Sequence, residues 1–274
     1  MSWREWSSHR KRWATGLLVG LPLLGVLTLG PLWMWLLLVV AAAGAGLWEL
    51  EGLLFPRRLS PSWRGLYMAG GLFLPAGAFG GGLSGLQVAL TGSFFLLLAA
   101  CLWDFEKLRE DGMGRLARFA LAWLYIPYLL SYALLVGALH QGRAWMVFVL
   151  VVIVASDSGA FYCGRRWGRR KLYPAVSPNK TVEGSAGGAL AALAAGSVFA
   201  LLFLDGVSAG AVVVLSLLLT LVGQTGDLAE SMMKRLAKAK DSGGLLPGHG
   251  GMLDRLDSLL FAFPAVWFFP GVTS

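Results

Sequence analysis

Long apolar runs alternate with short polar segments along this chain of 274 residues. Several of the runs reach about 18 residues or more, the length that an α-helix needs to cross a bilayer. The pattern predicts an all-α, polytopic integral membrane protein with about nine transmembrane helices. The expected spans are residues 14–30, 32–53, 66–80, 84–103, 117–139, 144–163, 186–204, 207–226 and 257–272.

The basic N-terminus precedes the first apolar run, an order of residues that also occurs in signal peptides. Here the run continues through Gly30, and Pro31 opens a second run almost at once. A cleavable signal has a short apolar core that is followed closely by a small-residue cleavage site. We therefore expect the first helix to be retained.

Composition supports the membrane assignment. Hydrophobic residues make up 57% of the chain and charged residues 14%, which is far more apolar than a soluble domain requires. The two cysteines, Cys101 and Cys163, lie in or beside apolar segments, without the spacing of a disulfide framework or a zinc site. We interpret both as small apolar packing residues.

The basic residues test the predicted topology. With nine helices, all of the 23 Lys and Arg residues except Arg143 fall on one side of the membrane. Short loops rich in Lys and Arg stay in the cytoplasm, so the N-terminus is expected to be cytoplasmic. The net charge of +8 then follows from membrane insertion, and it favours anionic lipid over nucleic acid as a partner. We expect a multi-pass protein of the cell inner membrane.

Polar residues concentrate in the second half of the chain, on the basic side. Two segments, 156–184 and 223–258, interrupt the apolar pattern there. We therefore divide the chain into an N-terminal transmembrane region, 1–140, and a C-terminal transmembrane catalytic region, 141–274, with cytoplasmic motif loops.

Two short stretches place carboxylates on one face of a predicted helix, at spacings of three and four residues. The first set is Asp227, Glu230, Ser231 and Lys234, and the second is Asp254, Asp257 and Ser258. Acids beside apolar spans are costly unless something neutralises them, and a divalent cation with oxygen ligands would do so. Such ligands favour Mg²⁺ or Mn²⁺ over Zn²⁺. The alternative is that these acids are solvated helix ends that cap helices or pair with nearby bases.

A glycine-rich loop lies between the two acidic faces. Its glycines, including Gly250 and Gly251, allow close approach of a ligand, and successive N–H groups can form a phosphate-binding nest. Glycine is abundant throughout this chain, and His249 alone is typical of a loop or capping residue. The nearby bases that could bind phosphates are Lys234, Arg235, Lys240 and Arg255. The combination indicates a metal–nucleotide or phosphate-ester site.

The earlier polar segment adds further candidates. Asp157 lies near the end of the sixth apolar run, where an acid is a functional candidate. Pro178 predicts an extended turn, from which Ser177 and Lys180 could reach a phosphate. The alternative is an ordinary basic loop that marks the cytoplasmic side.

With these residues the sequence resembles the phosphatidate cytidylyltransferases, also called CDP-diglyceride synthases. The run from Ser231 to Asp257, SMMKRLAKAKDSGGLLPGHGGMLDRLD, matches the family's C-terminal signature throughout. SDSGAFYCGRRWGRRK and SPNKTVEG resemble its middle motif, with Val182 in place of an expected aromatic residue. The resemblance covers roughly residues 150–260.

The resemblance implies transfer of a cytidylyl group from CTP to phosphatidate at the cytoplasmic membrane surface, with Mg²⁺ or Mn²⁺ as cofactor. It implies that Asp227 and Asp254 are the principal metal ligands, with Glu230 and Asp257 as secondary ones. It also makes a homodimer possible. The residues it assigns to phosphates are Ser177, Lys180, Lys234, Arg235, Lys240, His249, Gly250, Gly251 and Arg255.

Other functions are compatible with parts of the pattern. Another CTP-dependent lipid transferase, such as a polyprenol kinase or an archaeal-type ether-lipid cytidylyltransferase, would need similar groups, and a kinase would release CDP instead of pyrophosphate. An anion transporter would need access from both faces, whereas the polar residues here crowd one side.

Overall fold

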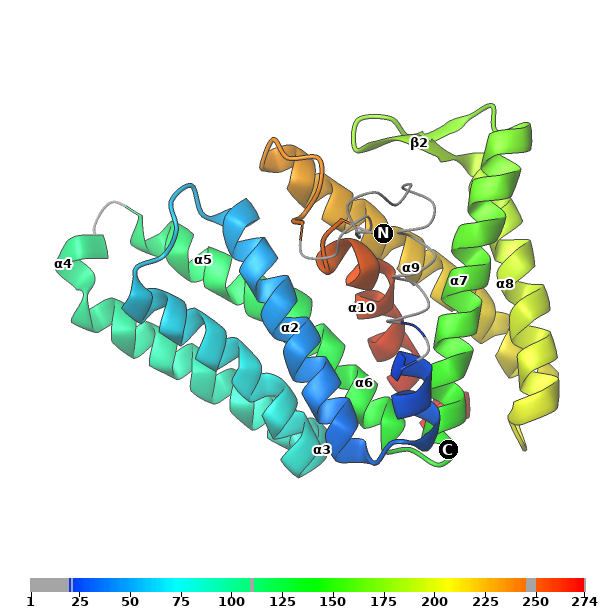
Figure 1. Cartoon of the computed structure of the whole chain (residues 1–274), viewed down its shortest axis with the longest axis horizontal. Helices are drawn as coiled ribbons and strands as arrows, with labels where there is room; N and C mark the ends of the chain where they lie inside the picture. The colour runs from blue at the N-terminus through cyan, green and yellow to red at the C-terminus, as the bar shows by residue number, and fades with distance from the viewer. Residues whose placement is uncertain (1–19, 21, 109–110, 245–249, 274) are drawn as a thin grey trace, which may run out of the picture.

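The computed structural model describes the whole chain except residues 1–19, 21, 109–110, 245–249 and 274. The described residues are mostly helical (Figure 1). The elements are α2 (Leu32–Leu54), α3 (Pro61–Trp103), α4 (Phe105–Leu108), α5 (Gly112–Trp123), the π-helix η2 (Leu124–Tyr128), α6 (Leu129–Gly137), α7 (Gly142–Trp167), β1 (Lys171–Tyr173), β2 (Ser177–Thr181), α8 (Val182–Phe203), α9 (Ala209–Leu236), α10 (Leu253–Trp267) and α11 (Pro270–Thr273).

Six helical stretches among the described residues are long and apolar enough to cross a membrane. They are α2, α3, the continuous stretch from α5 to α6, α7, α8 and α9. The helical, membrane-protein character predicted from the sequence is therefore confirmed. Three features separate these six stretches from the nine expected spans: α3 is broken in its middle, α10 has only 15 residues, and the first expected span, 14–30, lies partly outside the described residues.

The break in α3 occurs at Gly81 and Gly82, whose backbones are not helical. Gly82 has φ of +60°, which is accessible to glycine at little cost. The two halves fold back on each other and pack closely at glycine positions. A Cβ at Gly77 would lie only 2.5 Å from the carbonyl oxygen of Gly85. The Ser93 hydroxyl also donates across the pair to the Gly70 carbonyl oxygen, at 2.9 Å. The element is thus a helical hairpin (Figure 1).

Aromatic residues form the packed centre of the first half. The ring of Phe119, on α5, meets those of Tyr67 and Trp123 edge to face, with centroids 5.1 and 5.6 Å apart. Edge-to-face contacts are a preferred geometry for aromatic pairs. The Trp123 indole N–H donates to the Tyr67 carbonyl oxygen at 2.8 Å, so this buried polar atom is also satisfied.

Small residues allow α7 and α8 to pack closely. The buried positions of α8 are Gly184, Gly188, Ala192, Gly196 and Ala200. They form one stripe with a four-residue repeat, the pattern that lets two helix backbones approach in a membrane protein. A Cβ at Gly188 would lie 2.7 Å from the carbonyl oxygen of Ser156 on α7.

A short antiparallel hairpin, β1–β2, connects these two helices and departs from the all-α expectation. Lys171 pairs with Thr181, and Tyr173 with Ser177. The hairpin is anchored to the start of α8, because the Glu183 carboxylate accepts the N–H groups of Arg169 and Arg170 at 3.0–3.2 Å. Thr181 caps α8 by accepting the Gly184 N–H. The extended turn predicted around Pro178 is thus strand β2 of this hairpin.

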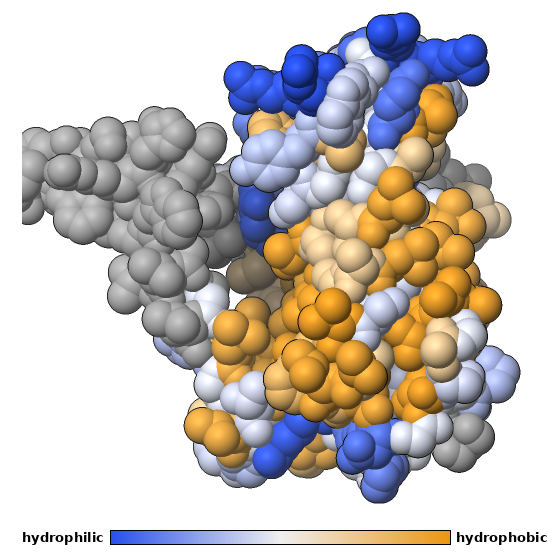
Figure 2. Space-filling model, turned by 90° about the vertical axis from the view of Figure 1, so that its right-hand side faces the viewer, coloured by the Kyte–Doolittle hydropathy of each residue, from blue (hydrophilic) through white to orange (hydrophobic). Residues whose placement is uncertain are grey.

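The hairpin, the segment after α9 and the segment after α2 lie at the same end of the helices, the upper end in Figure 1. Figure 2 shows a broad hydrophobic band over the side of the molecule that carries α8, between hydrophilic ends. The exposed side chains of α8 include Leu190, Val198 and Leu201. This distribution suits a helix surrounded by lipid.

Candidate active site

Helix α9 carries the first acidic face, as the sequence predicts. It continues without interruption from the apolar segment to Leu236, so Asp227, Glu230 and Lys234 follow one another along one side. The Lys234 ammonium group lies 2.5 Å from a Glu230 carboxylate oxygen, one turn away. The spacing of four residues therefore brings Glu230 and Lys234 together, as the sequence predicts.

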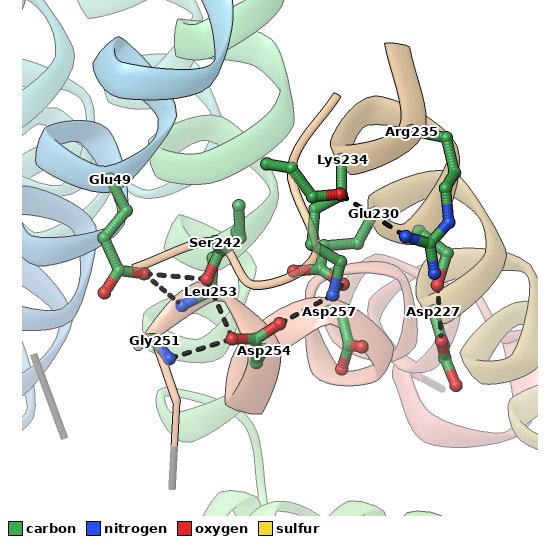
Figure 3. Close-up of polar contacts among 12 residues, drawn as sticks. Glu49, Asp227, Glu230, Lys234, Arg235, Ser242, Gly251, Leu253, Asp254 and Asp257 are labelled. Atoms are coloured by element: carbon green, nitrogen blue, oxygen red, sulfur yellow. Dashed lines mark hydrogen bonds and ion pairs between the residues drawn. The ribbon is translucent and has the colours of Figure 1, made fainter. Parts of the chain in front are cut away.

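The second acidic face begins at the start of α10 and meets the first through Lys234. The Lys234 Nζ atom lies 2.6 Å from Asp254 Oδ1, so one ammonium group bridges two carboxylates (Figure 3). Glu230, Lys234 and Asp254 are nearly buried, with side chains 1%, 12% and 14% exposed. Removing one partner of a buried ion pair leaves an uncompensated charge, so the three groups depend on one another.

Asp254 accepts three hydrogen bonds. Its Oδ2 atom accepts the Gly251 N–H at 2.8 Å and the Ser242 hydroxyl at 3.0 Å, while Oδ1 faces Lys234 (Figure 3). Burial opposes ionisation of this carboxyl group. The hydrogen bonds from Lys234 and Gly251 outweigh burial and lower the pKa of Asp254 to about 2. Asp254 is therefore a carboxylate at neutral pH.

A second ion pair joins the hairpin to α9. The Lys180 ammonium group, from β2, lies 2.6 Å from Asp227 Oδ2 and 3.5 Å from the Gln224 carbonyl oxygen. Both residues line a cavity of about 540 Å³ between α7, β2, α8 and α9. Asp157, Arg165 and Asn179 also line this cavity. It therefore offers both charges and amide groups to a polar ligand.

The oxygen donors of the site are suited to a hard divalent cation. The carboxylates of Asp157, Asp227 and Asp257 lie close enough to interact electrostatically. Glu230 Oε1 is buried without a hydrogen-bond partner among the described residues, so this acceptor is available to a ligand. No three His, Cys, Asp or Glu side chains of the described ranges form a ready-made metal site. Lys180 and Lys234 supply the cationic charge next to Asp227 and Asp254 in this arrangement.

The remaining predicted residues are placed differently. Arg235 donates weakly to the Val176 carbonyl oxygen, at 3.4 Å, and so links α9 to the hairpin. Lys240 and Arg255 are exposed, and Arg255 interacts electrostatically with Asp157. Ser177 is half-buried in β2.

In the glycine-rich loop, Gly250 has φ of +79°, a conformation that favours glycine. The Gly251 N–H, expected to face a phosphate, donates to Asp254. His249 lies outside the described residues.

One residue of the site, Glu49 on α2, was not predicted. Its carboxylate accepts the Leu253 N–H group at 2.9 Å and the Ser242 hydroxyl at 3.1 Å (Figure 3). It also accepts the Met252 N–H group, at 3.0 Å. The signal was present in the stretch GLWELEGLL, where Glu49 and Glu51 interrupt an apolar span. An acid in such a span is a functional candidate by default. The same rule that predicts a functional role for Asp157 therefore applies equally to Glu49.

Comparison with known proteins identifies a family and several relatives with similar sequences. A family model described as "Cytidylyltransferase family" matches residues 10–272. The phosphatidate cytidylyltransferase of Bacillus subtilis (strain 168) is 36% identical over 264 residues, which covers 94% of this chain and 96% of the relative. The protein of the same name from Brucella suis biovar 1 is 48% identical over 151 residues, 53% of this chain and 56% of the relative. That from Staphylococcus saprophyticus is 42% identical over 125 residues, 45% and 48%.

Proposed function

This chain belongs to the cytidylyltransferase family, and on that premise we propose that it transfers a cytidylyl group from CTP to phosphatidate. The products are CDP-diacylglycerol and pyrophosphate. The observation that supports the proposal most directly is that two Lys–carboxylate systems follow each other along α9, and that the first of them lines a polar cavity. Lys180–Asp227 lines the cavity, and Lys234–Glu230–Asp254 follows one turn further along α9.

The reaction makes one P–O bond and breaks another. A phosphate oxygen of phosphatidate attacks the α-phosphorus of CTP, and the bond from that phosphorus to the pyrophosphate oxygen breaks. A phosphate monoester has its second pKa at about 6, so much of the lipid phosphate is already a dianion at neutral pH. A general base is therefore a minor requirement. The main task is to bring two polyanions together and to stabilise the charge that develops on the leaving pyrophosphate.

The side chains of this chain divide that task. Lys180 lines the cavity, so its ammonium group contacts phosphate oxygens when it leaves Asp227. Arg165 and Asn179 line the same cavity and supply further donors. Lys234 holds Glu230 and Asp254 in a fixed arrangement. Lys234, Arg235, Lys240, His249 and Arg255, together with Ser177 and the Gly250–Gly251 backbone, stay proposed phosphate ligands.

A divalent cation, Mg²⁺ or Mn²⁺, completes the proposed site. Its ligands would be Asp227 and Asp254, with Glu230 and Asp257 as secondary ligands. When bound, such an ion would neutralise charge on the polyphosphate. Support comes from the all-oxygen donor set and from the unpartnered Glu230 Oε1 atom.

Membrane placement follows from the chemistry of the substrates. We propose nine spans by counting the two halves of α3 separately, adding the segment before α2, and including α10. The N-terminus and the site then face the cytoplasm of a cell inner membrane, where soluble CTP meets the phosphatidate headgroup. Residues 141–274 supply most of the catalytic groups, and a homodimer is part of the proposal.

The function is tested with purified protein in detergent, phosphatidate, Mg²⁺ and CTP labelled at the α-phosphate. We expect label to enter the lipid fraction with release of an equal amount of pyrophosphate, and EDTA to stop both. Label that stays in the aqueous fraction with folded protein would contradict the assignment. Transfer of label from γ-labelled CTP to a polyprenol would instead identify a kinase.

A further inference from the structure

We propose that Glu49 is a positioning residue of the active site, which holds the segment 251–253 and Ser242 so that Asp254 faces Lys234. The proposal rests on the function given above, and it assigns a role to the first half of the chain. Glu49 lies about 200 residues before its partners, with 203 and 204 positions separating it from Met252 and Leu253. Its side chain belongs to α2, whereas Asp254 belongs to α10 (Figure 3).

The geometry ties Glu49 to the backbone that carries Asp254. The first N–H groups of a helix have no partner within the helix, and the Glu49 carboxylate accepts two of them at the start of α10. A negative charge at a helix N-terminus is also favoured by the helix dipole. Since Leu253 directly precedes Asp254, a shift of this carboxylate moves the backbone of Asp254.

Ser242 connects the two acids. Its Oγ atom lies 3.1 Å from Glu49 Oε2 and 3.0 Å from Asp254 Oδ2. A hydroxyl group has one hydrogen, so it donates to one carboxylate at a time. The side chain is buried, which makes exchange of either contact for water costly. Glu49 and Asp254 thus share one donor, and removal of either changes the hydrogen bonding of the other.

Two glycines of the loop are explained by the same carboxylate. A Cβ at Gly243 would lie 2.5 Å from Glu49 Oε1, and a Cβ at Gly251 would lie 2.5 Å from Glu49 Oε2. The carboxylate cannot retreat without losing its three hydrogen bonds. By contrast, a Cβ at Gly244 would meet nothing within 4 Å. Gly243 therefore accommodates Glu49, whereas Gly244, directly after it, does not contact this carboxylate.

A purely structural role must be distinguished from a positioning role. Glu51, two residues along the same helix, provides the control because it is fully buried and holds the first half together. Its carboxylate binds the Arg64 guanidinium at 3.0–3.1 Å and the Leu59 N–H at 3.0 Å. Glu51→Gln removes a buried acid from α2 without touching Asp254.

The experiment compares Glu49→Gln and Glu51→Gln in the full-length protein. For each we measure kcat and KM for CTP per mole of folded protein, and hydrogen exchange of the amides 251–253. We expect Glu49→Gln to lower kcat by about 10-fold or more, as loss of an outer-shell partner does, with faster exchange of these amides. Glu51→Gln should lower the melting temperature and keep kcat. Unchanged kcat in Glu49→Gln, equal losses in both variants, or unchanged amide exchange would each overturn the proposal.

If Glu49→Gln does not fold, the pair Gly243→Ala and Gly244→Ala decides. We expect only Gly243→Ala to lower kcat, and equal rates in the two variants would overturn the proposal. If wild-type protein makes no CDP-diacylglycerol, the proposed function fails separately. Amide exchange then still decides whether Glu49 holds the segment: faster exchange in Glu49→Gln than in Glu51→Gln supports this, and equal exchange overturns it.

Discussion

Lys234 and Asp254 lie 20 residues apart in the sequence, yet Nζ and Oδ1 meet at 2.6 Å. The contact joins α9 to α10 across the glycine-rich loop. It is also mostly buried, so neither charge is exchanged easily for water. The two ends of the signature segment are thus fixed to each other directly.

Replacement of Asp254 by Asn should abolish most activity. The change removes a carboxylate that faces Lys234, Ser242 and the Gly251 N–H, and that we propose as a metal ligand. We expect kcat to fall by about 100-fold or more, the scale seen when an electrostatic group of an active site is lost. The assay is label transfer from CTP to lipid. Asp241→Asn, an exposed acid of the same loop, is the control, and equal rates in the two variants would refute the role.

Replacement of Lys180 by Met should weaken the handling of CTP. Lys180 is the basic side chain that β2 brings to Asp227 and the cavity. Without it, polyphosphate loses a counter-charge and Asp227 loses its partner, so we expect kcat/KM for CTP to fall by about 100-fold. Lys171→Met, on the exposed strand β1 of the same hairpin, should retain wild-type values. A comparable loss in Lys171→Met would point to general charge effects instead.

Acid should remove the stability that Asp254 contributes. Its pKa is lowered from 3.8 to about 2 in the folded protein, so the contribution is complete above about pH 4 and is lost as the pH falls through 2. The size is about 2 kcal/mol. Melting temperatures of wild type and Asp254→Asn, measured in EDTA between pH 6 and pH 2.5, should therefore converge toward acid. A difference that stays constant over this range would show that the carboxylate does not titrate as described.

Packing of α7 on α8 should be sensitive to volume at Gly188. A Cβ there would lie 2.7 Å from the Ser156 carbonyl oxygen, and backbone cannot move aside as a flexible side chain can. We expect Gly188→Val to cost about 1–3 kcal/mol by overpacking, seen as a lower melting temperature in detergent. Gly210→Val, at a position with nothing within 4 Å of its added Cβ, is the matched control. Equal melting temperatures for the two variants would contradict this account.

The periodicity of the sequence was sufficient to predict the two acidic helix faces of the candidate site. The spacing of Asp227, Glu230 and Lys234 predicted one helix face, and α9 presents it. The spacing of Asp254 and Asp257 predicted the start of a helix, and α10 begins at Leu253. Local rules succeed here because both acidic sets repeat at the period of a helix.

The features that the sequence did not predict depend on contacts between distant segments. Nothing in the spacing of residues 171–181 indicates a paired strand, because the hairpin depends on Glu183 holding its base. The partner of Lys180 could not be deduced, since Asp227 comes from another helix. The partners of Glu49 could not be deduced for the same reason, since its three donors lie some 200 residues later and only the folded chain brings them together.

The hairpin of α3 has a consequence for how the chain enters a bilayer during synthesis. The Ser93 hydroxyl finds its acceptor, the Gly70 carbonyl oxygen, on the opposite half of the element. A lone half would carry an unsatisfied hydroxyl and a bare glycine surface into hydrocarbon, which is unfavourable. Because only Gly81 and Gly82 connect the two halves, the halves stay close to each other along the chain. In the proposed nine-span topology, the two halves would therefore insert together, as a single unit that crosses the bilayer and returns.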